Sequence, residues 1–169
     1  MLVVVALGIN DADNTTLPAE ELSKLEAYRA EAGNKLLIEG PDFGADYDGE
    51  DLFDNLGLNL VHDGSADTNV HYFWAGPELW GNGRTITFGY DAGGDADHLV
   101  DVLATTSGLT TPIIWDQDSV ARGFYYNGSS NAMINTIYLG GIEDTIESAS
   151  RAVSSYLWRL GFENDYIRR

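Results

Sequence analysis

Apolar residues near the start of the chain form one almost unbroken run. Residues 2–8 alternate little and are nearly all apolar, which is typical of a strand covered on both faces, as in a parallel sheet. Thr16 and Pro18 then mark the start of a helix, and Gly33 marks its end. A second apolar run at 36–39 follows. The first forty residues therefore predict one β-α-β unit.

After residue 40 the chain has an irregular middle part, followed by a last third with a clear pattern of strands and one helix. A short helix at 51–56 and a strand at 59–62 precede an irregular stretch rich in Gly and Asp. Within and after that stretch we expect a strand at 84–88 and one helical turn at 97–103. The last third predicts strands at 112–115, 120–127 and 132–139, then a helix over 143–160. Gly128–Asn131 has the composition of a hairpin turn between the second and third of these strands.

These elements together predict a single α/β domain over residues 1–169. We expect a three-layer sandwich with a mostly parallel, flavodoxin-like sheet and an antiparallel hairpin near the C-terminus. In such sheets, ligands bind at the loops that follow the carboxyl ends of the strands. The turn after the strand at 36–39 is therefore the first place to look for a site.

The chain is strongly acidic, with 27 Asp and Glu against 9 Lys and Arg and a formal net charge of −18. Nucleic acid is excluded as a partner because phosphate neutralisation needs basic side chains. A solvating surface, as in salt-adapted or secreted proteins, explains the acidity. Calcium sites and a surface for a basic partner are the alternatives.

Several site classes are absent from the sequence. There is no Cys, which excludes disulfides, thiolate metal sites and a cysteine nucleophile. No apolar run is long enough for a membrane span, so membrane insertion is not expected. The first eight residues are too short for a signal peptide and lack its basic region. His62, His71 and His98 do not have the helical spacing of a zinc site.

The turn Gly40-Pro-Asp42-Phe-Gly44 has the spacing of a nucleophile elbow. An Asp holds the position where such elbows carry Ser or Cys. Asp42 is a candidate nucleophile or metal ligand, and Glu39 is close enough in sequence to form a carboxylate pair with it. The competing interpretation is that Asp42 caps the backbone of its own turn.

Four segments, two in the first third of the chain and two near its end, carry a family resemblance. Leu25-Glu-Ala-Tyr-Arg-Ala-Glu-Ala-Gly-Asn-Lys-Leu-Leu-Ile-Glu-Gly-Pro-Asp-Phe-Gly44 is followed by Phe53-Asp-Asn-Leu-Gly-Leu58. Near the end stand Ile137-Tyr-Leu-Gly-Gly-Ile-Glu143 and Ser150-Arg-Ala-Val-Ser-Ser-Tyr-Leu-Trp158. Together they resemble the class I glutamine amidotransferase-like fold, in the divergent form found in modular secreted proteins of prokaryotes. In that fold an earlier strand and helix precede the strand that begins here at Leu2. The resemblance therefore implies a truncated chain, or one completed by a partner.

The departures from the family decide the expected function. An amidotransferase needs a Cys at the elbow and a His after the last strand. This chain has Asp42 in the first place and Gly141-Ile142-Glu143 in the second. Glu143 matches the family's carboxylate, but there is no His for it to orient. The resemblance thus implies a non-catalytic accessory or ligand-binding domain of a larger, extracellular protein, whose partner is a small molecule or a neighbouring domain.

Two alternatives remain open at this point. One is a hydrolase that uses Glu39, Asp42 and Glu143 in one cleft, with or without a metal. The other is a carbohydrate-binding module, which requires exposed coplanar aromatic rings. Its candidate aromatic residues are Trp74, Trp80, Tyr90, Trp115, Tyr125 and Tyr126.

No cofactor is expected other than calcium. The acidic groups that suggest a calcium site contain Asp46 and Asp48, and Asp95 and Asp97. Neither group fits the twelve-residue loop with Gly at position six.

Overall fold

A computed structural model describes residues 1–8, 17–64, 69–80, 85–91, 100–143 and 146–162. Its strands are β1 (Leu2–Ala6), β2 (Lys35–Glu39), β3 (Leu58–His62), β4 (Tyr72–Ala75), β5 (Ile86–Gly89), β6 (Val102–Thr105), β7 (Thr110–Asp116), β8 (Ala121–Asn127) and β9 (Asn131–Asn135). Its helices are α1 (Ala19–Ala30), α2 (Phe43–Tyr47), α3 (Asp51–Asn55), α4 (Pro77–Trp80) and α5 (Ile146–Arg159), and a 3-10 turn spans Leu139–Gly141.

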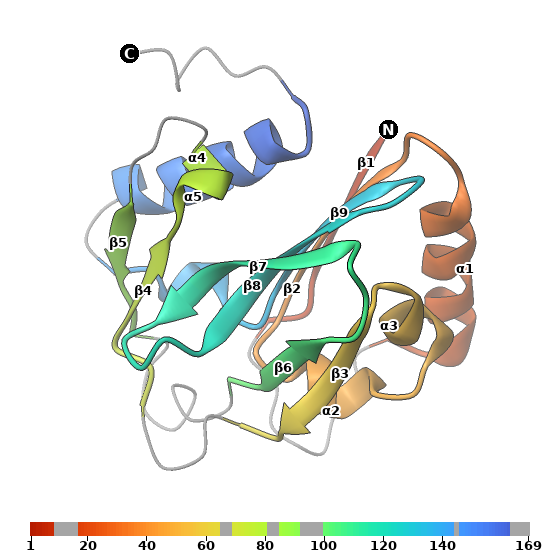
Figure 1. Ribbon diagram of the computed structural model, residues 1–169, viewed down its shortest axis with the longest axis horizontal. Coiled ribbons are helices and arrows are strands. Elements are labelled where there is room, and N and C mark those ends of the chain that lie inside the picture. The colour runs from red at the N-terminus through yellow and green to blue at the C-terminus, as the bar shows by residue number, and fades with distance from the viewer. Residues whose placement is uncertain (9–16, 65–68, 81–84, 92–99, 144–145, 163–169) are drawn as a thin grey trace.

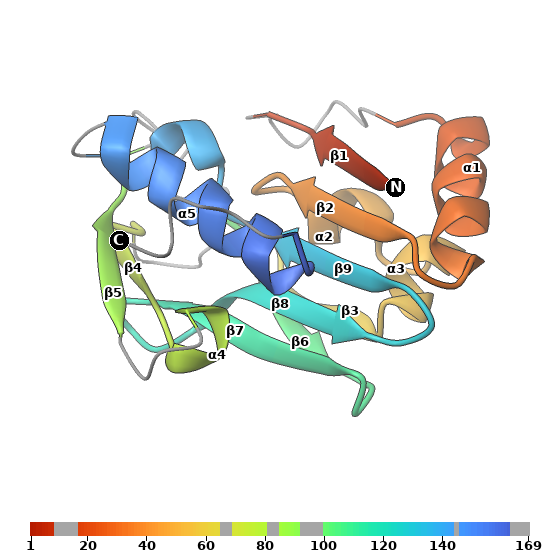
Figure 2. The same ribbon diagram turned by 90° about the horizontal axis from the view of Figure 1, so that it is seen from above.

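Seven strands form one sheet in the order β1-β2-β9-β8-β7-β4-β5. Two neighbouring pairs of this sheet, β1–β2 and β2–β9, are parallel. The other four neighbouring pairs, β9–β8, β8–β7, β7–β4 and β4–β5, are antiparallel. The sheet is curled, with β1 and β5 at its two edges (Figures 1 and 2). The prediction of a mostly parallel, flavodoxin-like sandwich is therefore wrong.

The first β-α-β unit is confirmed, since β1 and β2 pair in parallel and α1 connects them. The predicted hairpin is confirmed as well, since Asn127 pairs with Asn131 across β8 and β9. The first strand, however, is not covered on both faces. β1 lies at an edge of the sheet and Val4 is 55% exposed.

Two elements in the middle of the chain differ from prediction. A helical turn was expected at 97–103, but its last two residues belong to strand β6, because residues 102–105 pair with β3 in a separate two-stranded sheet. Residues 97–99 lie outside the described part of the chain. Leu103 packs into the core at that position. Strand β4 was not predicted at all. This separate sheet lies beside α2, α3 and the β7–β8 hairpin (Figure 1).

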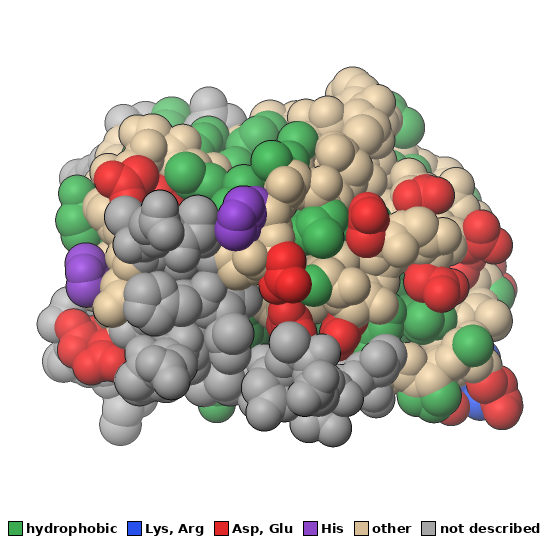
Figure 3. Space-filling model, turned by 90° about the horizontal axis from the view of Figure 1, so that it is seen from below, with side chains coloured by type: hydrophobic (Ala, Val, Ile, Leu, Met, Phe, Trp, Pro, Cys, Tyr) green, Lys and Arg blue, Asp and Glu red, His purple; other side chains and the backbone are tan. Residues whose placement is uncertain are grey.

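Two hydrophobic cores occupy opposite faces of the large sheet, because side chains alternate along β2. Leu36 and Ile38 pack with α1, α2 and α3. Leu37 packs with α4 and α5. Acidic side chains are spread over the face of the molecule seen from below (Figure 3). Within the described residues, no helix is long and apolar enough to cross a bilayer.

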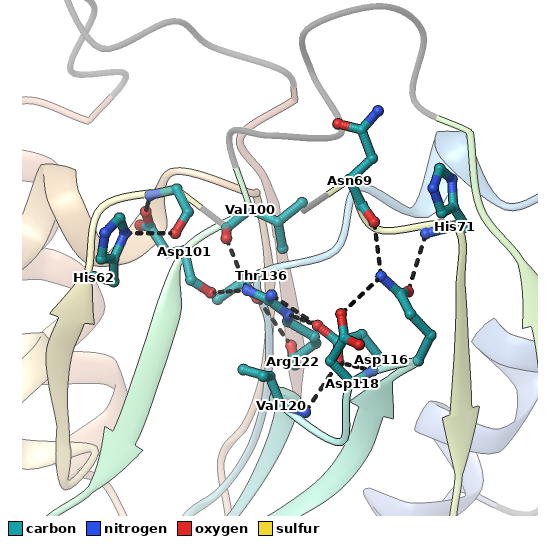
Figure 4. Close-up of polar contacts among 12 residues, drawn as sticks. His62, Asn69, His71, Val100, Asp101, Asp116, Asp118, Val120, Arg122 and Thr136 are labelled. Carbon is teal, nitrogen blue, oxygen red and sulfur yellow. Dashed lines mark hydrogen bonds and ion pairs between the residues drawn. The ribbon is translucent and has the colours of Figure 1, made fainter. Parts of the chain in front are cut away.

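A buried ion pair in the large sheet is hydrogen-bonded to the segment that leads into β6. Arg122 of β8 and Asp116 of β7 are each 1% exposed, and Nη2 and Oδ2 lie 2.7 Å apart. Arg122 Nη1 also donates to the main-chain oxygens of Val100 and Asp101, at 2.8 and 2.9 Å. Asp116 Oδ1 accepts the N–H groups of Asp118 and Val120. Figure 4 shows this network joining the large sheet to the start of β6.

We expect Arg122→Met to destabilise the fold by about 3–5 kcal/mol, because it leaves Asp116 as an unpaired buried charge. Urea unfolding measures the loss. Lys24→Met is the control, since Lys24 is 59% exposed in its pair with Glu20 and an exposed ion pair contributes little to stability. Similar losses in the two variants would contradict the assigned role of Arg122.

Candidate functional site

The elbow after β2 is the centre of the candidate site. Gly40, Pro41 and Asp42 link β2 to the short helix α2, and the Gly40 N–H donates to Asn135 of β9. A Cβ on Gly40 would lie 2.8 Å from the Cβ of Leu7. The glycine is therefore required by the close approach of the chain that leaves β1.

Asp42 is buried, at 5% exposure, and precedes α2. Its side chain makes no capping hydrogen bond to that helix. The expectation that Asp42 caps its own turn is therefore wrong for α2. The structure brings it instead to two acidic residues that sequence reasoning did not select.

Asp42, Asp63 and Asp101 form a cluster in which one carboxylate oxygen from each residue lies within 4.8 Å of the others. Asp63 follows β3 and is exposed, whereas Asp101 precedes β6 and is fully buried. The three residues come from three separate connections of the chain. No local motif links them, and no pattern in the sequence would have identified the three as a set.

Asp101 is fixed by backbone donors. Its Oδ1 accepts the Gly64 N–H at 3.0 Å and its Oδ2 accepts the Ala45 N–H at 2.8 Å. Its own N–H donates to Pro41 at 2.8 Å. These bonds join the elbow, the end of β3 and the start of β6, and so they fix the Asp101 carboxylate beside Asp42.

The electrostatics of the cluster favour an added positive charge or a shared proton. The pKa of Asp101 is raised to about 6, chiefly by burial; the backbone donors oppose the rise and the nearby Asp63 carboxylate adds to it. Arg122 bonds the main-chain oxygen of Asp101 and not its carboxylate. Three carboxylates around one point can hold a hard cation, which takes oxygen ligands.

The other predicted site residues do not join this cluster. Glu39 is buried, and its Oε2 accepts the Leu139 N–H at 2.7 Å. Burial raises the pKa of Glu39. The pKa of Tyr156 in α5 is raised mainly by burial and further by the negative charge of Glu39. Glu143 is exposed. In the described part of the chain, Asp42 converges with Asp63 and Asp101, and the predicted trio of Glu39, Asp42 and Glu143 is not among the converging acidic groups.

Among the described residues, the predicted calcium ligands Asp46 and Asp48 do not belong to a cluster of converging acidic groups. Burial raises the pKa of Asp46, but Asp46 is not part of the acidic cluster. Asp48 is exposed and its Oδ1 accepts the Leu60 N–H at 3.2 Å. Asp95 and Asp97 lie outside the described residues.

Comparison with known proteins gives a likeness in fold. No family model matches the chain, and no curated protein matches it. Among solved structures it is similar to the exo-beta-1,4-mannosidase Op5Man5 from Opitutaceae bacterium strain TAV5, with a TM-score of 0.55 and 12% identity. The match covers 94% of this chain and 23% of that chain. A second structure, Agd3, a novel carbohydrate deacetylase, has a TM-score of 0.49 and 12% identity, over 94% of this chain and 24% of that one.

These matches have a limited meaning. The chain spans about a quarter of the length of each structure that it matches. At 12% identity the likeness to the mannosidase concerns the fold alone, and the second likeness is too low to support an argument. Neither bears on the resemblance to glutamine amidotransferases.

A substitution at Gly44 tests how closely the atoms beside Asp101 are packed. A Cβ on Gly44 would lie 2.9 Å from Asp101 Oδ2 and 2.9 Å from Leu60, and closer still to Leu103. We expect Gly44→Ala to destabilise the protein by about 1–3 kcal/mol by overpacking. Gly108→Ala is the matched control, because nothing lies within 4 Å of its Cβ position. Thermal unfolding of both variants checks the difference, and equal midpoints would contradict it.

The raised pKa of Asp101 predicts that the stability of the folded protein depends on pH. Its folded pKa of about 6 lies above the unfolded value, so its stabilising contribution is complete below the unfolded pKa and is lost as the pH rises through about 6. The loss between about pH 5 and about pH 7 is ~1 kcal/mol. Urea unfolding with EDTA at both pH values measures it. Asp101→Asn, which does not titrate, should show a loss smaller by that amount, and an unchanged loss would contradict the assignment.

Proposed function

We propose that this chain is an accessory module of a larger carbohydrate-active, extracellular protein and that it binds calcium at Asp42, Asp63 and Asp101. The observation on which the proposal rests is the convergence of the three carboxylates within 4.8 Å. Two oxygens on opposite sides of a calcium ion are at most about 5 Å apart. The cluster therefore has the size of a calcium ligand sphere.

The chemistry of the donors favours calcium over other cations. The cluster contains carboxylates only, and such hard ligands suit calcium, magnesium and manganese rather than zinc or copper. Calcium tolerates irregular ligand geometry and magnesium does not. Asp63 is exposed, which leaves room for water ligands. Calcium sites in extracellular modules bind at about 0.1–1 mM, which sets the concentration range for a titration.

The accessory role is supported by two further observations. The mannosidase segment that shares this fold makes up 23% of that enzyme, so the fold occurs as one part of a larger protein that acts on carbohydrate. Among the described residues, the acidic side chains that converge with Asp42 are Asp63 and Asp101 and not Glu39 or Glu143, the residues expected to serve a hydrolase. We therefore favour binding over hydrolysis.

Calcium should raise the unfolding temperature of the apoprotein. At a concentration of ~100 times Kd the gain is ~2.7 kcal/mol, which is roughly 5–10 °C for a chain of this size. Differential scanning fluorimetry after EDTA treatment measures it. Because a chain of charge −18 is also stabilised by simple salt, the titration is run at constant ionic strength, with NaCl and MgCl2 as comparisons.

Substitutions of the carboxylate ligands test whether calcium stabilises the protein at this site. Asp42→Asn and Asp63→Asn should remove the calcium-dependent gain, since each removes a charged ligand. Asp54→Asn, at an exposed position of α3, should keep it. Equal stabilisation by magnesium, calcium and NaCl would overturn the site, as would a full calcium response in both ligand variants.

A further inference from the structure

Trp74 of β4 and Trp115 of β7 stack on each other across neighbouring strands. The two residues are directly paired in the antiparallel register. Their ring centroids lie 4.5 Å apart and the ring planes differ by 19°. Both side chains are only partly buried, which distinguishes this pair from the aromatic residues of the two cores.

The pair faces away from the core that lies under α5. Phe73 and Ala75, the neighbours of Trp74 in β4, are 0% exposed and belong to that core. Because successive side chains of a strand point to opposite faces, Trp74 points to the other face of the sheet. Its partner in β5 is Thr87, which is exposed, and Tyr72 is 42% exposed two residues along β4.

This face also offers polar groups. In the described part of the chain, no hydrogen bond engages the indole N–H groups of Trp74 and Trp115 or the hydroxyls of Tyr72 and Thr87. Neither indole nitrogen is among the buried groups without a partner. The face therefore combines a wide aromatic surface with accessible donors and acceptors.

We propose that Trp74 and Trp115, with Tyr72 and Thr87 beside them, form a binding site for a neutral glycan. The C–H groups on one face of a pyranose ring carry partial positive charge and pack against the negative face of an indole ring. The hydroxyl groups at the ring edge then bond to the indole N–H groups and to the two hydroxyls. The net charge of −18 repels uronate and sulfate groups, and this selects a neutral polysaccharide.

The pair also supports the sheet, as cross-strand aromatic pairs do. A purely structural pair gains most by full burial, since each ring buries a large apolar area. Tyr90, Tyr125 and Tyr126, three other aromatic candidates from the sequence, are buried in this way. The side chain of Trp80 lies outside the described residues. The partial exposure of Trp74 and Trp115, together with their polar neighbours, is what points to a ligand.

The experiment is a binding assay on the whole chain with a fixed panel of polysaccharides. Affinity electrophoresis and tryptophan fluorescence are measured with β-mannan, glucomannan, cellulose oligosaccharides, xylan and starch, and with polygalacturonate as the acidic comparison. We expect binding to at least one neutral glycan and none to polygalacturonate. Trp74→Ala and Trp115→Ala should each weaken that binding at least ~10-fold, the scale of a lost aromatic stacking contact.

Trp158→Ala is the matched control, because Trp158 is 37% exposed on α5, outside the pair, and its loss should leave binding unchanged. Trp115→Phe keeps an aromatic face and should retain more binding than Trp115→Ala if stacking is the cause. Circular dichroism confirms that each variant is folded. The proposal is overturned if the wild type binds no neutral glycan, if polygalacturonate binds equally well, or if folded Trp74→Ala and Trp115→Ala bind normally.

This site does not depend on the proposed calcium site. Glycan binding is therefore measured in calcium and again in EDTA, and equal affinity is expected. Binding that survives EDTA and Asp63→Asn supports the tryptophan site even if calcium does not bind. Binding that is lost in EDTA but not in Trp74→Ala would assign the glycan to the carboxylate cluster and overturn the proposal.

Discussion

The buried pair of Arg122 and Asp116 is the interaction on which the arrangement of this protein depends. One guanidinium satisfies a carboxylate in β7 and two main-chain oxygens just before β6. A buried charge is tolerated only when its partners are complete, and here the partners of Arg122 come from two separate parts of the chain, β7 and the segment before β6. The pair therefore determines where the small sheet lies against the large one.

The position of the carboxylate cluster follows from that arrangement. Arg122 holds the backbone of Asp101, and Asp101 accepts N–H groups from both Ala45 and Gly64. Hydrogen bonds of Asp101 thus fix the elbow, the end of β3 and the start of β6 to one another. The cost is a buried carboxyl whose pKa is raised to about 6, and a bound cation would remove that cost.

The two proposed sites differ in chemistry because their surroundings differ. At the elbow, three converging carboxylates favour a positively charged ligand. On the face of β4 and β7, two stacked indoles and free hydroxyl groups favour a neutral ligand with both apolar and polar edges. A protein with a net charge of −18 can bind both, since a cation is attracted by that charge and a neutral glycan is not affected by it.

The sequence by itself determined the features that depend on nearby residues. The β-α-β start, the turn at Gly40–Gly44 and the hairpin at Gly128–Asn131 follow from local periodicity and turn chemistry. Strand direction does not, because a short apolar run such as Phe73–Ala75 looks the same in a parallel or an antiparallel pair. Residues 102–105 became a strand only because β3 supplied a partner. Likewise Asp42 was found from its turn, whereas Asp63 and Asp101 joined it through contacts between distant segments that only the tertiary structure decides.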